Sequence, residues 1–268
     1  MNDARKRVWL LGCGRMGRVL LRGWQRGGII ADYTVIDPKA ASLANEFAGA
    51  NFTAAVPDGH ADILVIALKP QKIPTILPAY HRHLAADSAV LSVAAGYGCA
   101  AISADLQLND SARVARAMPN LPAALGQGIS GFYAPPALPR RADCLELLAV
   151  LGPILELVQE DALHAVTALS GSGPAYVFYL LEAMVMAAQA VGLSADEGKV
   201  LARQTIIGAA AMLAESPDDA AALRAQVTSP GGTTAAAMAV LTEQNRFAEI
   251  LRTAITQAQL RSRELADG

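Results

Sequence analysis

The feature that most constrains the fold of this chain is a short apolar run, VWLL, that leads directly into the glycine pattern GCGRMG and then into a helical pattern. Its three glycines have the spacing G-x-G-x-x-G. Between a strand and a helix, the first permits a tight turn, the second lets a pyrophosphate approach the backbone, and the third lets helix and strand pack closely. The segment therefore predicts a dinucleotide site whose first cofactor contacts are Gly12, Cys13, Gly14, Arg15, Met16 and Gly17.

The chain up to residue 159 continues as an alternation of strand and helix patterns. Its strand candidates are apolar throughout, which is typical of parallel strands covered on both faces. The pattern predicts an α/β fold with an N-terminal Rossmann-type doubly wound sheet over residues 1–159. The expected strands are Val8–Leu11, Tyr33–Ile36, Ile63–Ala67, Ala89–Val93 and Val114–Ala117, and the expected helices are Arg15–Arg26, Ala40–Phe47 and a region around Ile73–His83.

Residues 160–268 lose the strand signal and are rich in Ala, Leu, Met and Glu. This half is predicted to be an all-α domain for substrate binding and dimerisation. Its segment 177–191 is apolar on nearly every face, and so small a domain cannot bury that segment alone, so we expect an obligate oligomer. The expected helices are Gly173–Ala190, Ala195–Leu213, Asp218–Gln226, Thr233–Gln244 and Phe247–Leu265.

Composition argues against several kinds of partner. The formal net charge is −2 and aromatic residues make up 5% of the chain, so we expect no nucleic-acid surface. No apolar stretch approaches the roughly 20 residues that span a bilayer. The three cysteines are far apart and form no C-x-x-C pair, and His81 and His83 lie in a polar segment. We therefore expect no disulfide, no metal site, and a reducing cytoplasm as the location.

Asp37 ends the second predicted strand, about 20 residues beyond the last glycine of the pattern. An acidic side chain there accepts a hydrogen bond from the adenosine 2′-OH and repels a 2′-phosphate, which favours NADH. Lys39 and Ser42 follow closely and could offset this repulsion, so NADPH stays open. The alternative is that Asp37 only belongs to an Asp-Pro turn.

Ligands of open parallel sheets lie at the carboxyl ends of the strands. The ends of the later predicted strands therefore supply further expected cofactor contacts. For Lys69, the alternative interpretation is an ordinary surface lysine. For Asn120, it is a turn residue between two prolines. These contacts are Ala67, Leu68, Lys69, Pro70, Ala95, Gly96 and Asn120.

Two helix starts rich in glycine and hydroxyl residues, SGSGPAY and SPGGTT, stand in the helical half. The plainer interpretation of SPGGTT is a turn with Thr233 or Thr234 as the helix cap. The alternative is an anion site, because free N–H groups at a helix start attract carboxylate or phosphate. No hydrolase elbow, zinc motif or phosphate-binding lysine loop occurs. An imine fits as substrate, since it needs little acid–base help.

LLGCGRMG, ALKP, VAAG, RAMPNLPA, EDALHAVTALSGSGPAYVF and VTSPGGTT occur in this order along the chain. Together they resemble the Δ1-pyrroline-5-carboxylate reductase family essentially from end to end. The resemblance implies a Rossmann domain and a helical domain that intertwines into dimers, often assembled further into a decamer. It also implies reduction of the cyclic imino acid pyrroline-5-carboxylate to L-proline with NADPH or NADH.

The resemblance also assigns roles in the helical half. It implies that the amides of Thr233 and Thr234 hold the substrate carboxylate and that the Thr234 hydroxyl, the implied catalytic group, lies by the ring nitrogen. Arg15 and Leu121 depart from the asparagine and threonine common in the family. The other implied pocket residues are Ser229, which shapes the loop, Gly232, Glu160, and Gln226, which stands where relatives often have an asparagine near the nicotinamide.

Other functions are compatible with parts of this pattern. A related imine reductase could act on another cyclic imino acid, such as one with a six-membered ring. A hydroxyacid dehydrogenase would need a placed lysine or histidine, which the pattern does not supply. A non-catalytic dinucleotide-binding regulator would not need the SPGGTT loop.

Overall fold

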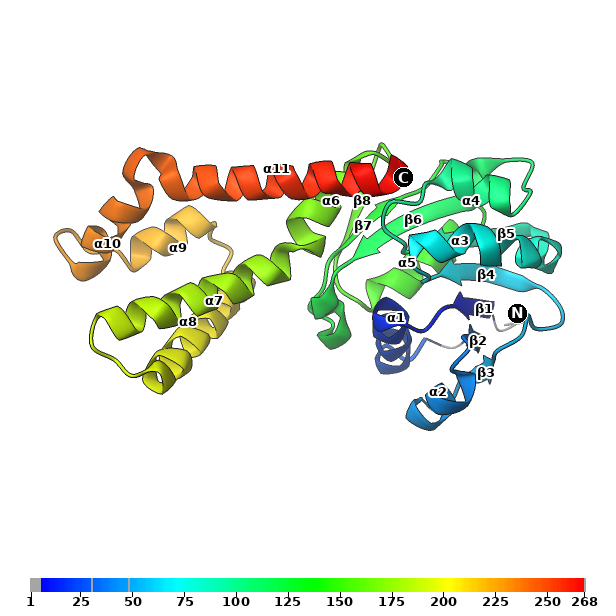
Figure 1. Ribbon diagram of the computed structural model, residues 1–268, viewed down its shortest axis with the longest axis horizontal. Coiled ribbons are helices and arrows are strands. Elements are labelled where there is room, and N and C mark those ends of the chain that lie inside the picture. The colour runs from blue at the N-terminus through cyan, green and yellow to red at the C-terminus, as the bar shows by residue number, and fades with distance from the viewer. Residues whose placement is uncertain (1–5, 30, 48, 268) are drawn as a thin grey trace. The chain divides into compact units, whose positions relative to one another are not determined.

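The structure is a computed structural model that describes residues 6–29, 31–47 and 49–267. The chain forms two compact units (Figure 1). The first contains the residues up to Ser172 together with those from Ala258 onward, and the second contains Gly173–Gln257.

The first unit is built on an eight-stranded sheet with the order β3-β2-β1-β4-β5-β6-β7-β8. Neighbouring strands are parallel except β6 and β7, which are antiparallel. The order reverses between β1 and β4, which is the switch point where such sheets bind ligands. All five predicted strands are confirmed. The strands are β1 Lys6–Leu11, β2 Ala31–Ile36, β3 Asn51–Thr53, β4 Ala61–Ile66, β5 Leu84–Ser92, β6 Val114–Pro119, β7 Ser130–Tyr133 and β8 Ile154–Leu157.

Hydrophobic cores cover both faces of this sheet, which confirms the doubly wound fold. In β1, Val8 and Leu10 enter one core, whereas Trp9 and Leu11 enter the other. Because successive side chains of a strand point to opposite faces, both sets must be apolar. Helices α1 and α5 contribute to the first core, and α3 and α4 contribute to the second. The helices of this unit are α1 Arg15–Arg26, α2 Ala40–Glu46, α3 Ile73–Ile76, α4 Cys99–Asp105, α5 Arg141–Ala149 and α6 Ala162–Val166.

The predicted helical region around Ile73–His83 is confirmed, but it is not one continuous α-helix. Only α3 is α-helical there, and a 3-10 segment follows over Leu77–His83. Two prolines, Pro74 and Pro78, explain the difference. Pro74 stands in the first turn of α3, where it is tolerated, but Pro78 has no N–H to continue the α-helical hydrogen bonds.

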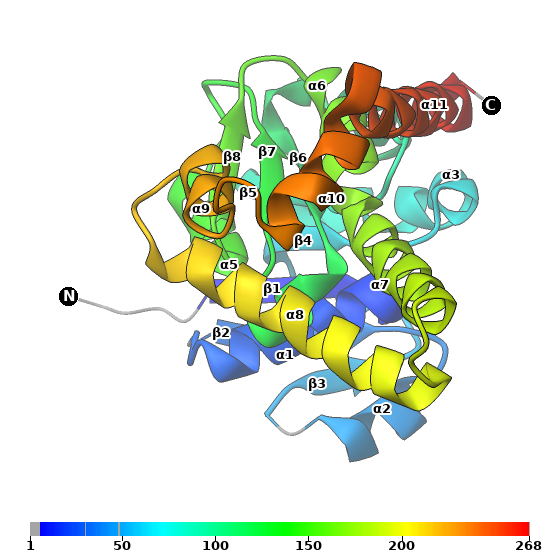
Figure 2. The same ribbon diagram turned by 90° about the vertical axis from the view of Figure 1, so that its left-hand side faces the viewer.

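The second unit is entirely helical among the residues described. The predicted helices are confirmed with small shifts of their ends, and α7 and α8 lie side by side (Figures 1 and 2). The turn between them ends in a capping box, in which Ser194 and Glu197 bond each other's backbone N–H groups. The helices are α7 Gly173–Ala190, α8 Ala195–Glu215, α9 Ala220–Gln226 and α10 Thr233–Thr242, followed by α11 Arg246–Asp267, which ends in the first unit.

The second unit leaves large apolar side chains in solvent. In α7, no residue is buried, and Phe178, Tyr179 and Met186 are 62%, 66% and 58% exposed. Apolar surface of this kind is typical of an interface between subunits. No helix in the described part of the chain is both long and apolar enough to cross a membrane.

Candidate functional site

The glycine loop between β1 and α1 requires glycine at two positions for reasons of backbone packing. Gly12 has φ +91°, and a Cβ there would lie 2.9 Å from the carbonyl oxygen of Ala67. A Cβ on Gly17 would lie 2.3 Å from the carbonyl oxygen of Gly12, closer than any real contact. The first turn of α1 therefore packs directly on the loop, as the sequence pattern predicts.

Gly14 has a different surrounding. It is the N-cap residue of α1, and a Cβ there would meet no atom within 4 Å. No side chain caps the helix start, and its first turn contains no acidic residue. Backbone N–H groups at an open helix start favour an anion, so the space beside Gly14 fits the pyrophosphate of a dinucleotide.

These surroundings predict different effects on stability for two small substitutions. Gly17→Ala should lower both the melting temperature and the affinity for dinucleotide, because the new Cβ displaces backbone. Gly14→Ala should leave the melting temperature within about 2 °C of the original, since one surface substitution rarely changes stability further. It should still weaken dinucleotide binding. Thermal unfolding and tryptophan fluorescence titration measure the two effects, and an unchanged melting temperature in Gly17→Ala would contradict the packing argument.

Asp37 holds the glycine loop as well as its own turn. Its Oδ2 accepts a hydrogen bond from the Cys13 N–H at 2.8 Å, and its Oδ1 accepts one from the Lys39 N–H at 2.8 Å. A carboxylate oxygen can accept a second hydrogen bond, so the turn role and a contact with ribose are compatible. The buried Cys13 thiol has its pKa raised to about 11, chiefly by burial.

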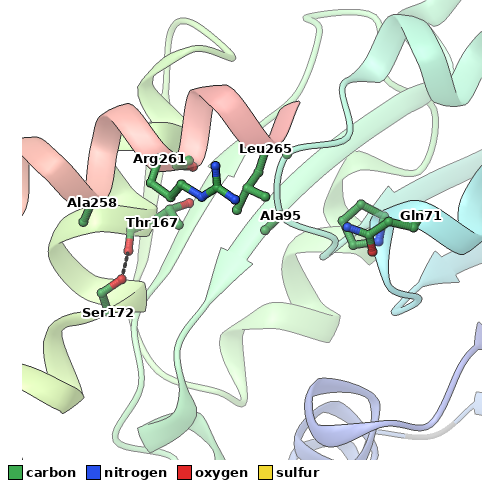
Figure 3. Close-up of a pocket in the computed structure, with 10 residues that line it drawn as sticks. Gln71, Ala95, Thr167, Ser172, Ala258, Arg261 and Leu265 are labelled. Carbon is green, nitrogen blue, oxygen red and sulfur yellow. Dashed lines mark hydrogen bonds between the residues drawn. The ribbon is translucent and has the colours of Figure 1, made fainter. Parts of the chain in front are cut away.

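A cavity of about 390 Å³ lies beside the carboxyl ends of β4 and β5 (Figure 3). Three predicted strand-end contacts line it, namely Pro70, Ala95 and Gly96. Figure 3 also shows Thr167 and Ser172 on the opposite side, where the Ser172 hydroxyl donates to the Thr167 carbonyl. Arg261 supplies the charge in the lining and also pairs with Glu264 at 2.8 Å. Among the other predicted contacts, Ala67 and Leu68 are half-buried, and Lys69 is exposed.

Glu160 accepts two hydrogen bonds through one carboxylate oxygen. Its Oε1 accepts hydrogen bonds from the Cys99 N–H and from the Arg116 guanidinium, both at 2.8 Å. The pKa of the buried Cys99 thiol is raised to about 12, first by burial and then by the charge of Glu160. Sequence reasoning missed Arg116, although an arginine inside the apolar strand VARAMP was a signal for a buried charge.

Asn120 uses both ends of its amide within the fold. Its Nδ2 donates to the carbonyl of Ser170 at 3.2 Å, and its Oδ1 accepts from the Ile129 N–H at 3.0 Å. These bonds support the turn interpretation, while a contact with the cofactor stays a prediction.

The SPGGTT loop of the second unit forms an open helix start. Gly231 has φ +72°, and Gly232 is the N-cap residue of α10, with no side-chain cap bond. Thr233 and Thr234 therefore do not cap the helix, contrary to the plainer interpretation. The loop is tight, since a Cβ on Gly232 would lie 2.5 Å from Ser229 Oγ.

The backbone donors at this helix start are the relevant groups. The Gly232 N–H bonds the Ser229 carbonyl at 3.1 Å, and the Ala236 N–H bonds the Gly232 carbonyl at 3.2 Å. The amides of Thr233 and Thr234 lie between these two bonds, in the first turn of α10, where N–H groups have no intrahelical acceptor. Gln226, seven residues before Thr233, donates through Nε2 to Asp218 Oδ2 at 2.7 Å.

The histidines show no arrangement for metal binding. The His83 ring packs against Trp9 at a tilt of 44°, and its Nδ1 lies 2.8 Å from the Gly59 carbonyl. His164 bonds Ser262. Within residues 6–29, 31–47 and 49–267, no group of three or more His, Cys, Asp or Glu side chains could hold a metal ion.

Comparisons with known families match both units. A model of NADP oxidoreductases described as coenzyme F420-dependent matches residues 7–96, and a model described as pyrroline-5-carboxylate reductase dimerisation matches residues 160–265. Each match lies in the half for which the sequence predicts the corresponding role.

Similar proteins cover nearly the whole chain. The pyrroline-5-carboxylate reductase of Pseudomonas aeruginosa is 39% identical over 97% of both chains. That of Escherichia coli is 33% identical over 97% of this chain and 98% of its own. Among solved structures, a pyrroline-5-carboxylate reductase from Coxiella burnetii has TM-score 0.88 and 32% identity over 97% of this chain and 98% of its own. A Plasmodium falciparum pyrroline carboxylate reductase with NADP bound has TM-score 0.80 and 25% identity, covering 98% and 99%.

Proposed function

The chain belongs to the pyrroline-5-carboxylate reductase family, and we propose that it reduces the C=N bond of 1-pyrroline-5-carboxylate to give L-proline. The observation that carries the proposal is the open start of α10, where Gly232 and not a hydroxyl side chain is the N-cap residue. A chain that only bound dinucleotides would have no use for this second anion site. The bound nicotinamide, NADH or NADPH, supplies the hydride.

The first unit holds the dinucleotide in this proposal. Gly12 and Gly17 fix the loop at the start of α1, and Gly14 leaves open space there that would hold the pyrophosphate. Asp37 would bind the adenosine ribose, and the strand ends that carry Ala67–Pro70 and Ala95–Gly96 would contact the nicotinamide end. Asn120 supports this edge of the sheet through its hydrogen bonds to the backbone of Ser170 and Ile129.

The SPGGTT loop binds the imino acid. The backbone N–H groups of Thr233 and Thr234 hold the carboxylate, because a helix start offers aligned donors and a favourable dipole. The Thr234 hydroxyl lies by the ring nitrogen. As the hydride adds to the imine carbon, the nitrogen becomes an amine, and this hydroxyl orders the ring and relays a proton from water.

A substrate panel tests this function against its alternatives. Oxidation of NADH and NADPH is followed with pyrroline-5-carboxylate and with six-membered piperideine carboxylates, and proline is identified as product. We expect pyrroline-5-carboxylate to give the highest kcat/KM. A higher kcat/KM with the six-membered ring would make the chain a reductase of another cyclic imino acid, and binding of dinucleotide without oxidation would make it a regulator.

The choice between NADH and NADPH depends on Asp37 in this proposal. Asp37→Ser removes a negative charge beside the 2′-position, so the ratio of kcat/KM for NADPH over NADH should rise about 10- to 100-fold. Both nucleotides should also bind more weakly, because the Cys13 N–H loses its acceptor. Asp37→Asn is the matched control for this second effect, since it keeps an acceptor oxygen for the Cys13 N–H. A ratio that stays constant in Asp37→Ser would leave Asp37 as a turn residue only.

We further infer a homodimer formed through the helices of the second unit, with the family's decamer as a larger assembly. The exposed side chains of α7 and the matched dimerisation model support the dimer. The three cysteines are buried and unpaired, which suits a reducing cytoplasm.

A further inference from the structure

The turn between β5 and α4 carries Ala95 and Gly96, and it is held at both of its ends by side chains. At the first end, the Ala94 carbonyl accepts a hydrogen bond from Nη2 of Arg116 at 3.4 Å. At the second end, the Cys99 N–H donates to Oε1 of Glu160 at 2.8 Å. The two ends of one short backbone segment therefore depend on two side chains from elsewhere in the chain.

These two side chains also bind each other. Arg116 Nη1 lies 2.8 Å from Glu160 Oε1, so the pair forms a brace from one end of the turn to the other. Arg116 is only 6% exposed, and it projects from β6, where it pairs in register with Ser92 of β5. The Ser92 hydroxyl in turn accepts from the Ala94 N–H at 3.3 Å. The sheet thus fixes the position of Arg116, which forms one end of the brace.

The middle of the turn has little room to adjust. Gly96 has φ +68°, and a Cβ there would lie 3.2 Å from the Leu265 carbonyl in α11. A glycine with positive φ that packs against a neighbouring backbone leaves the turn few other conformations. The direction in which Ala95 and Gly96 present their backbone is consequently set by the two braced ends.

We propose that Arg116 and Glu160 are positioning residues that hold the turn Ala94–Cys99 against the nicotinamide end of the dinucleotide, and that Glu160 acts through this brace. The inference rests on the proposed function, because it takes the strand-end turn as a cofactor contact. It assigns a role to Arg116 and moves Glu160 from the substrate pocket to the support of the cofactor site.

A double variant separates positioning from plain stability. Glu160→Ala leaves the buried Arg116 charge unpaired, so the melting temperature should fall by about 10 °C. Adding Arg116→Met removes that charge and should restore most of the loss. The double variant still lacks both holding bonds, so its dissociation constants for NADH and NADPH should stay about tenfold higher than those of the original protein. Amide hydrogen exchange at residues 94–99 should also be faster.

Two further variants act as controls. Glu160→Gln keeps the acceptor oxygen and should lie closer to the original protein in affinity and exchange. Glu156→Ala removes the solvent-exposed Arg141–Glu156 ion pair of the same unit and should change neither affinity nor exchange. Binding and exchange are measured without any imine, so they report on the brace even if the protein does not reduce pyrroline-5-carboxylate.

The expected result is recovery of the melting temperature without recovery of dinucleotide affinity. A double variant with the original affinity and exchange would show that the pair only stabilises the fold, and would overturn the proposal. So would a Glu160→Gln variant in which KM for the imine rises while dinucleotide affinity stays constant, because Glu160 would then contact the substrate itself.

Discussion

Thr234→Ala should lower kcat for imine reduction by about 10²- to 10³-fold, the range for loss of one preorganised donor in the transition state. The Thr234 hydroxyl faces the ring nitrogen in the proposed complex, and the structure gives this side chain no capping role at α10. The backbone amides still hold the carboxylate, so KM for the imine should change less than kcat. Steady-state kinetics with saturating dinucleotide measures both constants.

Matched variants sharpen this prediction. Thr234→Ser keeps the hydroxyl and should retain most of the activity, and Thr233→Ala removes a neighbouring hydroxyl but keeps the amide. Dinucleotide affinity should change in none of them, since the glycine loop lies in the other unit. A Thr234→Ala variant with nearly the original kcat, or one whose main defect is dinucleotide binding, would disprove the proposed role.

Phe178→Lys should abolish the homodimer. Phe178 is 62% exposed on α7 within one chain, together with other large apolar side chains of that helix. In the proposed interface, the substitution would bury a charge without a partner, which costs far more than the interface gains from one side chain. Light scattering after gel filtration should therefore show monomer or aggregate in place of a defined oligomer.

The control for this variant is Leu125→Lys. Leu125 is also a strongly exposed apolar residue, but it belongs to the first unit. Its replacement should leave the oligomer intact. An unchanged oligomer in Phe178→Lys would place the interface on another surface of the chain.

The sequence predicted those parts of the fold in which local pattern and burial agree. The central strands β1 and β4 are covered on both faces, so their runs are apolar and visible, and α1 and α7 were predicted with the ends that the structure shows. Strands β3, β7 and β8 were missed. They are three or four residues long, and β8 lies at the sheet edge with Glu156 exposed, so it has no continuous apolar run.

The candidate site was predictable where backbone geometry requires a residue type. Gly12 and Gly17 could be assigned from spacing because only glycine fits there. The partners of Asp37 and Glu160 could not be predicted, because Cys13 and Arg116 meet them through tertiary contacts between segments 24 and 44 residues apart. A charge in an apolar strand signals that a partner exists but does not identify it.

The first unit is discontinuous, and this has a consequence for how the protein is made. A growing chain presents the sheet to solvent early, but Ser262 and Arg263, which bond His164 and Asp161, leave the ribosome about 100 residues later. Part of the cavity lining, namely Ala258, Arg261 and Leu265, is likewise synthesised after the helices of the second unit. The cavity beside the carboxyl ends of β4 and β5 is therefore complete only after the helices of the second unit have been synthesised.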